Sequence, residues 1–330
     1  MRSPVLEPTP DLSGRATRPA AIASVAMAVP DNVVTNATVA QSAGVTEQWI
    51  VHRTGVHERR HVREGERLQD LAGAAGREAL ERAGLAPVDV DMVLVATVGA
   101  DELLPNAAPL VAQDLGAVSA GTMDVGAACT GYLSALSLAA AQVESGRCEH
   151  VLVIGADVLS RFTDKTDRGT AALFADGAGA TVVSPAGDGE GLICHIALHA
   201  DGNGAAAIRA GDDRIIHMQG HDTFKAAVQR LSESTVEAVE QVGLGLDDIG
   251  LFVYHQANAR ILTAVGERLG LERGRVIDCI DRYGNTSSAT LPIALADARE
   301  RGMLEPGMNV LLAAFGAGFT WGAGVIQWGP

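Results

Sequence analysis

The sequence is short of aromatic residues, cysteines and basic residues, and each shortage excludes something. Aromatic residues make up 4% of the 330 residues, so the core has to be built from Ala, Val and Leu. The four cysteines, Cys129, Cys148, Cys194 and Cys279, show no paired or metal-ligand spacing, which argues against a disulfide framework or a zinc site. The formal charge of −15 argues against binding to nucleic acid or to a membrane through a polybasic patch.

Long apolar runs are also missing. No segment approaches the ~20 apolar residues of a transmembrane helix. Residues 1–18 are rich in Pro, Thr and Arg and have no hydrophobic signal core, so we expect a disordered extension and a cytoplasmic location. The 47% hydrophobic content and the 38 glycines are typical of a globular α/β enzyme, and this length predicts one large domain or two fused ones.

The most informative segment surrounds Cys129. A short apolar segment, 121–125, enters it, and a segment with helical spacing from Leu133 to Val143 leaves it. Small residues on both sides of the cysteine allow a sharp turn from strand to helix. A thiol at a helix start faces free backbone N–H groups and the positive end of the helix dipole, which favour the thiolate. The alternative is a small buried cysteine in a core turn.

Polar residues of the second half follow strands in the same way. His255 ends the apolar segment 251–254, Asn285 lies in a glycine-hinged loop, and the glycine-rich turn 315–319 follows segment 310–314. Ligands of open α/β sheets bind at the carboxyl ends of strands. A cysteine and a histidine from distant segments are a candidate nucleophile and base. Taken singly, His255 can be a helix cap and Asn285 a turn former.

The two halves of the chain repeat one pattern. Residues 81–96 and 240–254 share their spacing, and each block is followed by a helix ending in Leu-Gly. This indicates a duplicated helix–strand–helix unit and predicts two packed sheets, with helices between and outside them. We place the halves at 19–185 and 186–330, divided near a glycine-rich, acidic stretch. Segments 180–183 and 192–198 are further expected strands, for which a hairpin across this boundary is one arrangement.

Several motifs in this order resemble those of the β-ketoacyl-acyl-carrier-protein synthase III family, the initiating condensing enzymes of the thiolase superfamily. The resemblance covers roughly residues 20–328. The motifs are Trp49-Ile50-Val51-His52-Arg53-Thr54-Gly55, Ala127-Ala128-Cys129-Thr130-Gly131, Thr166-Asp167-Arg168-Gly169-Thr170, Phe174-Ala175-Asp176-Gly177-Ala178-Gly179, His255-Gln256-Ala257-Asn258, Gly284-Asn285-Thr286-Ser287 and Gly318-Phe319-Thr320-Trp321-Gly322.

The resemblance implies a thiolase-like five-layered αβαβα fold and an acyltransferase without a cofactor. It implies a decarboxylative Claisen condensation of an acyl-CoA primer with malonyl-acyl-carrier protein, through an acyl-Cys129 intermediate. The implied donors to the malonyl enolate are a neutral His255 and Asn285. The backbone N–H groups of Cys129 and Ala317 match the oxyanion hole. The family is homodimeric.

Substrate-binding residues are implied in the same way. The CoA site matches Trp49, Arg53, Arg168, Gly220 and Asn258, in which Trp49 and Arg168 sandwich the adenine. Lys225 and Arg260 match basic positions that attract the carrier protein, although exposed helix charges give the same pattern. Segment 53–67, with five arginines, is a candidate basic patch on an acidic body, or an ordinary solvated loop.

The acyl pocket departs from the family pattern. Its implied residues are Leu104, contributed by the partner subunit, Tyr132 in place of a usual Phe, and Phe174. Acetyl-specific members carry Phe where this chain has Leu104. The extra volume favours a primer longer or more branched than acetyl, at about 0.8 kcal/mol per methylene. Loop 201–217 matches the loop that covers the active site and is shorter. The alanine-rich, arginine-over-lysine composition is associated with polyketide-priming members, which is association only.

Other functions stay in competition with condensation. Some relatives transfer the acyl group to a hydroxyl or an amine, and many of these lack the Asn that this chain keeps as Asn285. A biosynthetic thiolase needs a second cysteine in the glycine turn 315–318, which has none. The order of Cys129, His255 and Asn285 does not suit a papain-like protease. A non-catalytic partner subunit is disfavoured because this set is complete.

Overall fold

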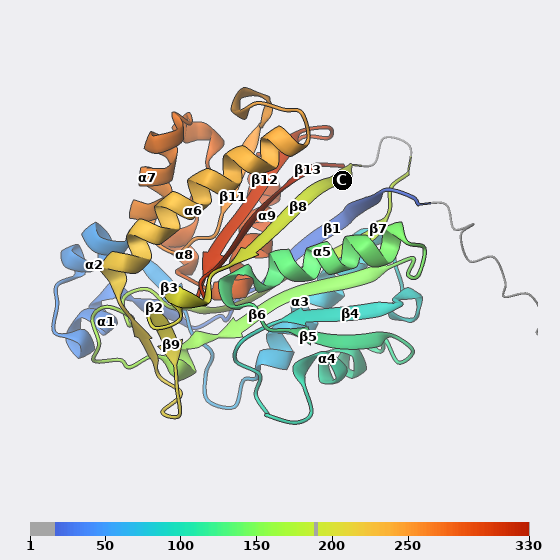
Figure 1. The fold of residues 1–330 in the computed structure, drawn as a ribbon. Coiled ribbons are helices and arrows are strands. Elements are labelled where there is room, and N and C mark those ends of the chain that lie inside the picture. The colour runs from blue at the N-terminus through green and yellow to red at the C-terminus, as the bar shows by residue number, and fades with distance from the viewer. Residues whose placement is uncertain (1–16, 188–190, 330) are drawn as a thin grey trace, which may run out of the picture.

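The computed structural model describes residues 17–187 and 191–329 and has two sheets in a stack of five layers (Figure 1). The first sheet has the order β1-β7-β6-β4-β5, with β4 parallel to both β5 and β6. Its strands are β1 (Ala20–Ala28), β4 (Met92–Ala96), β5 (Gly121–Val125), β6 (Val151–Val158) and β7 (Asp176–Pro185). The second has the order β11-β12-β13-β8, with β11 parallel to β12. Its strands are β8 (Leu192–Ala200), β11 (Leu251–Tyr254), β12 (Asn309–Gly316) and β13 (Thr320–Gln327).

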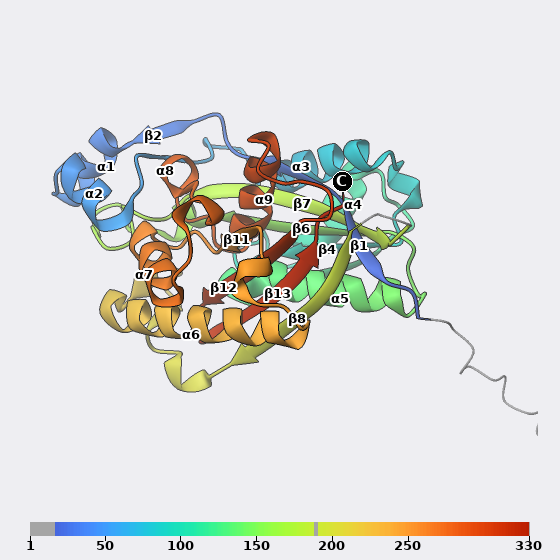
Figure 2. The ribbon, with the colours of Figure 1, turned by 90° about the horizontal axis from the view of Figure 1, so that it is seen from above.

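Helices fill the space between the sheets and cover their outer faces (Figure 2). The inner pair is α5 (Gly131–Glu144) and α9 (Thr290–Glu300), which bury Leu136 and Leu295 in one core with strands of both sheets. The outer pairs are α3 (Leu68–Ala83) with α4 (Ala107–Leu115), on the first sheet, and α6 (Gly220–Gln241) with α7 (Ala259–Leu269), on the second. This arrangement confirms the predicted thiolase-like αβαβα fold.

Smaller elements gather at one end of the stack, on the left in Figure 1. They are α1 (Asn36–Ala43), α2 (Glu47–Thr54), α8 (Ile280–Tyr283), the ribbon β2 (Val33–Thr35) with β3 (Glu58–Arg60), and the ribbon β9 (Ile208–Ala210) with β10 (Ile216–Met218). Several of these elements supply side chains to the cavity described below.

The repeated blocks of the sequence form the same local structure twice. The backbone N–H of Ala86 donates to the Asp89 carboxylate at 2.9 Å before β4, and that of Gly245 donates to the Asp248 carboxylate at 2.8 Å before β11. In each half the strand that follows is buried and parallel to a neighbour. The same capped turn therefore precedes the equivalent strand in both halves.

Two expectations need correction. β7 and β8 form no hairpin, because β7 lies between β1 and β6 while β8 pairs with β13 in the other sheet. Arg18, assigned to the extension, is held in place by bonds to the Val143 and Cys148 carbonyls at 3.1 and 2.8 Å; residues 1–16 lie outside the described part. Among the described helices, none has both the length and the apolar character that crossing a membrane requires.

Candidate active site

Cys129 lies in a tight turn between β5 and α5. The turn is the 3₁₀ segment Ala128–Thr130, and α5 begins two residues after the cysteine. Ala128 has a φ of 47°, in the left-handed region that residues other than glycine seldom adopt. The Thr130 hydroxyl donates to the Ala127 carbonyl at 2.7 Å and secures the turn. A strained backbone thus presents the Cys129 side chain where a strand gives way to a helix.

The glycine turn after β12 packs directly against the cysteine. A Cβ at Gly316 would lie 2.9 Å from the Cys129 backbone nitrogen and 3.0 Å from the Cys129 Cβ. Real Cβ atoms do not approach so closely, so glycine is required here. The contact places Ala317, the next residue, in the cavity wall that also contains Cys129. Segments almost 190 residues apart in the chain therefore meet at the sulfur.

The electrostatics of Cys129 differ from the expectation that its turn favours the thiolate. Burial raises the pKa of the Cys129 thiol to about 12, interaction with the Ser287 side chain lowers it, and a negative charge on the nearby Asp157 carboxyl would add to the rise. Loss of water around the sulfur outweighs the stabilisation from the helix start. The thiol is therefore neutral in the resting enzyme, and it has to lose its proton when it reacts.

His255 directly follows β11 and is almost completely buried. Its backbone N–H donates to the Ala313 carbonyl at 2.8 Å, which fixes it against β12. Burial lowers the pKa of His255 to about 3, so the imidazole is neutral, as the sequence predicts. Its Nδ1 is buried without a hydrogen-bond partner in the described part of the chain. The next residue, Gln256, braces this loop by donating to the Tyr254 and Ile277 carbonyls at 2.9 and 3.2 Å.

Asn285 is oriented by its neighbours. Its backbone N–H donates to the Leu173 carbonyl, and its own carbonyl accepts from Ala175, both at 2.9 Å. Its side-chain Oδ1 accepts from the Ser287 N–H at 2.9 Å. Because that oxygen is engaged, the amide presents Nδ2 as its available donor, for which no partner exists in the described residues.

These side chains line one cavity of about 840 Å³. The cavity walls contain most of the predicted site residues, namely Cys129, His255, Asn285, Ala317, Trp49, Arg53, Arg168, Gly220, Asn258, Phe174 and Arg260. The nucleophile, the two donors and the CoA-binding residues predicted from the sequence therefore share one space. Cavities of this size hold substrate- or cofactor-sized ligands.

The predicted adenine-binding residues meet at the exposed side of this cavity. The guanidinium carbons of Arg53 and Arg168 each lie 5.8 Å from the centre of the Trp49 ring. Asn258 caps α7 by accepting from the Arg260 N–H at 2.9 Å, and its side chain donates to the Arg53 carbonyl at 3.0 Å. The indole and two cations form a surface suited to a base and to phosphates.

The cavity is basic although the chain is acidic. Its charged lining residues are arginines, Arg53, Arg168, Arg209 and Arg260, and its wall contains no Asp or Glu. These arginines form no ion pair within the described residues, whereas many arginines elsewhere pair with carboxylates, as Arg282 does with Asp297 at 2.8 Å. Unpaired cations in one wall favour an anionic ligand.

Three predicted site residues lie outside the cavity. Tyr132 is fully buried in the central core, where its hydroxyl lies 3.1 Å from that of Thr181, so its assignment to the acyl pocket is wrong for this subunit. Leu104 is 79% exposed and does not contact the cavity of its own chain. Lys225 is exposed beside Phe224, over whose ring the Arg260 guanidinium lies at 5.6 Å.

Arg209 and His221 also line the cavity, although the sequence did not predict either as a site residue. Arg209 comes from the β9–β10 ribbon, within the glycine- and alanine-rich segment expected to cover the site. The available signal was a pair of arginines, Arg209 and Arg214, in that segment. Arg209 reaches the cavity only because the segment folds into a ribbon, and hydrophobic periodicity does not predict that ribbon.

The fold and this site together define a condensing acyltransferase of the thiolase type, and comparisons with known proteins narrow this class. Residues 123–202 match the family model described as 3-oxoacyl-[acyl-carrier-protein (ACP)] synthase III, and residues 239–328 match its C-terminal model. Beta-ketoacyl-[acyl-carrier-protein] synthase III of Listeria welshimeri is 40% identical over 94% of this chain and 99% of its own length. The enzyme of that name from Oceanobacillus iheyensis is 42% identical over 91% of this chain and 96% of its own length.

Solved structures similar to this chain include members of the same family. The synthase III of Thermus thermophilus superimposes with a TM-score of 0.90 at 42% identity, over 94% of this chain and 99% of its own. The priming β-ketosynthase of the R1128 polyketide pathway superimposes with a TM-score of 0.93 at 34% identity, over 97% of this chain and 100% of its own. The chain belongs to the β-ketoacyl-[acyl-carrier-protein] synthase III family.

Proposed function

We propose that the chain moves an acyl group from CoA to Cys129 and condenses it with malonyl-acyl-carrier protein, releasing carbon dioxide. The observation that carries this proposal is the meeting of Cys129, His255 and Asn285 in one basic cavity. The cavity supplies a nucleophile, two neutral donors and, at its mouth, cations for the CoA phosphates. No cofactor is needed for this chemistry.

In the first step Cys129 Sγ attacks the thioester carbonyl of the acyl-CoA. The thiol proton leaves as the bond forms, and the neutral His255 accepts it. The tetrahedral oxyanion takes hydrogen bonds from the backbone N–H groups of Cys129 and Ala317. The intermediate collapses, the CoA sulfur leaves, and it receives the proton, so that acyl-Cys129, free CoA and a neutral His255 remain.

In the second step the malonyl thioester loses its carboxylate as carbon dioxide. The electron pair of the broken bond forms an enolate, whose oxygen accepts hydrogen bonds from His255 and from Asn285 Nδ2. The enolate carbon then attacks the carbonyl of acyl-Cys129. The same two backbone N–H groups hold the second oxyanion, which collapses to the β-ketoacyl product as the Cys129 thiolate leaves. The thiolate then takes a proton from water, which restores the neutral thiol.

The proposal includes a homodimer and a primer larger than acetyl. Strand β5 lies at the edge of the first sheet and exposes Met123, and the nearby loop exposes Leu103 and Leu104. A second copy pairing along this edge covers these apolar residues. In that dimer Leu104 enters the partner's cavity, near Phe174, and leaves more room than Phe would. Lys225 and Arg260 are the proposed contacts for the acidic carrier protein.

A second candidate function transfers the acyl group to a hydroxyl or an amine without condensation. Asn285 disfavours it, because simple acyl transfer has no use for a second oxyanion donor in this position. Incubation with a panel of acyl-CoAs, read by intact mass, tests the first step. We expect a single acyl group on Cys129, and an acyl group mapped to Cys148, Cys194 or Cys279 refutes the proposed intermediate. Carbon dioxide release from malonyl-carrier protein then separates the two functions.

A further inference from the structure

Asp157 is a fully buried carboxyl group at the end of β6 that the proposed mechanism does not use. One oxygen, Oδ1, accepts from the Thr97 hydroxyl at 3.1 Å and from the Val98 N–H at 3.0 Å. The other, Oδ2, lies 3.0 Å from the Ser288 nitrogen and 2.7 Å from the Ser288 hydroxyl oxygen. The group therefore joins the loop after β4 to the loop that carries Asn285.

The donors and acceptors around the Ser288 hydroxyl indicate whether Asp157 is ionised or protonated. The Ser288 hydroxyl oxygen lies 2.7 Å from Asp157 Oδ2 and 2.8 Å from the Ala96 carbonyl oxygen. An ionised carboxylate and a carbonyl both only accept, and the hydroxyl has one hydrogen to give. If Asp157 carries a proton, Oδ2 donates to Ser288 and Ser288 donates to Ala96, so every close contact has its own hydrogen.

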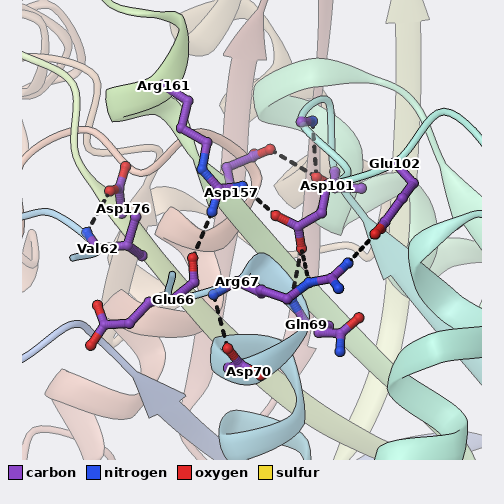
Figure 3. A network of polar contacts seen from close by, with 12 residues as sticks. Val62, Glu66, Arg67, Gln69, Asp70, Asp101, Glu102, Asp157, Arg161 and Asp176 are labelled. Atoms are coloured by element: carbon purple, nitrogen blue, oxygen red, sulfur yellow. Dashed lines mark hydrogen bonds and ion pairs between the residues drawn. The ribbon is translucent and has the colours of Figure 1, made fainter. Parts of the chain in front are cut away.

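The surroundings of Asp157 support the neutral form. In the described part of the chain its partners are Thr97, Val98, Ser288 and the side chain of Ser287, and no arginine, lysine or histidine pairs with it. Burial raises the pKa of Asp157, and the hydrogen bonds oppose this only in part. The loop that begins at Thr97 also holds two other acidic residues, but these have cationic partners: Arg67 pairs with Glu102, and Arg161 with Asp101 (Figure 3).

Asp157 lies near both Cys129 and the loop that carries Asn285. Its carboxyl group is close enough that ionisation would raise the pKa of Cys129, and the Ser287 side chain interacts with both residues. Ser288 follows Ser287, whose N–H holds the side chain of Asn285. The loop is pressed onto β6, since a Cβ at Gly155 would lie 2.4 Å from the Ser288 carbonyl oxygen.

We propose that Asp157 is a positioning residue that keeps its proton in the resting enzyme, and so ties the Asn285 loop to the first sheet without placing a negative charge beside Cys129. This role rests on the acyl-Cys129 mechanism proposed above. Negative charge develops on the Cys129 sulfur and on the malonyl enolate during that mechanism. A neutral acid gives the same hydrogen-bonded anchor as a carboxylate without repelling either charge.

Two measurements that need no substrate test the protonation. The infrared spectrum of wild type minus Asp157→Asn at neutral pH should contain the carbonyl band of a protonated carboxyl group, shifted by deuterium. Alkylation of Cys129 by iodoacetamide should differ by less than about threefold between the two proteins, because an adjacent full charge changes thiol pKa by roughly one unit or more. A carboxylate band, or alkylation roughly tenfold faster in Asp157→Asn, overturns the proposal.

Steady-state assays test the positioning. Asp157→Ala should lower malonyl decarboxylation by about 100-fold while acyl-Cys129 formation falls far less, since small displacements of a catalytic group have such effects. Asp157→Asn should restore most of the loss. Equal losses in both half-reactions contradict positioning of Asn285. If Asp157→Ala does not fold, Thr97→Val removes one hydrogen bond to Oδ1. It should also lower decarboxylation more than acylation, by a smaller factor. A wild-type enzyme that is never acylated refutes the proposed function but leaves the infrared result intact.

Discussion

The side-chain oxygen of Asn285 accepts a hydrogen bond of 2.9 Å from the backbone N–H of Ser287. Ser287 has a φ of 51°, so a strained backbone supplies this bond. The bond fixes which end of the amide faces the cavity and leaves Nδ2 to donate. Asn285 thus differs from His255, whose donor role depends on burial that keeps its ring neutral.

Removal of the Asn285 amide should separate the two half-reactions. In Asn285→Ala the thiol and the two backbone N–H groups remain, so acyl-Cys129 should still form. Malonyl decarboxylation should fall on the order of 100-fold or more, the loss expected for one oxyanion donor. Intact mass measures the acylation, and release of labelled carbon dioxide measures the decarboxylation.

The control for this prediction is Asn285→Asp, which keeps the shape of the side chain and replaces the Nδ2 donor by an oxygen. It should be at least as impaired in decarboxylation as Asn285→Ala. An Asn285→Ala enzyme that forms β-ketoacyl product at the wild-type rate removes the condensation mechanism and favours simple acyl transfer.

The contact between Gly316 and Cys129 predicts a large effect from one methyl group. Gly316→Ala places a Cβ within 3.0 Å of the Cys129 backbone and Cβ, so the nucleophile has to move. We expect acylation of Cys129 to slow by about 100-fold. Gly126→Ala is the matched control, since it lies in the same active-site region with nothing within 4 Å of its added Cβ. It should acylate at close to the wild-type rate.

Much of the fold and site could be predicted because the signals are local. Strands β5 and β11 have the predicted bounds, since each is a short segment ended by turn residues. Cys129, His255 and Asn285 follow such segments or lie in adjoining loops, so the sheet edges bring them together. The spacing shared by the duplicated halves also predicts the two large sheets, though not the two-stranded ribbons β2–β3 and β9–β10.

Other features depend on the assembled fold. β8 follows β7 in the sequence but joins the other sheet, because β13 and not β7 offers it an antiparallel neighbour. Tyr132 follows the cysteine motif, yet the first turn of α5 points it into the core toward Thr181. The raised pKa of Cys129 comes from burial by distant segments. None of these causes is local in sequence.

We expect the arginines at the cavity mouth to contribute to the binding of CoA and not to the reaction steps. Arg168→Ala and Arg53→Ala each remove a cation 5.8 Å from the Trp49 ring. We expect the KM for acyl-CoA to rise about tenfold, equivalent to about 1.4 kcal/mol. With an acyl-pantetheine substrate, which lacks the nucleotide, the variants should match wild type. An equal loss with both substrates contradicts the nucleotide assignment.

Burial of His255 should make the folded protein less stable in acid. The pKa of His255 falls from 6.5 to about 3 on folding, so between these values the unfolded chain binds a proton that the folded chain does not. The free energy of unfolding therefore decreases as pH falls through this window. The wild type should lose roughly 2 kcal/mol more than His255→Gln between pH about 7.5 and pH about 5. Denaturant titrations of both proteins measure this, and parallel losses contradict a buried neutral imidazole.

Leu104 should set the size of the primer from the partner subunit. It is 79% exposed in the single chain and follows two residues, Asp101 and Glu102, that Arg161 and Arg67 hold in place (Figure 3). Leu104→Phe should fill part of the acyl pocket and raise the ratio of acetyl to longer-acyl turnover by about tenfold, the effect of about two methylenes.

Leu103→Phe is the matched control, since Leu103 is also exposed, at 94%, and is adjacent. The assignment requires that Leu104→Phe changes the ratio, that Leu103→Phe does not, and that both variants remain dimers by light scattering. If Leu103→Phe gives the same change, the effect comes from altered dimer packing, and Leu104 does not line the pocket.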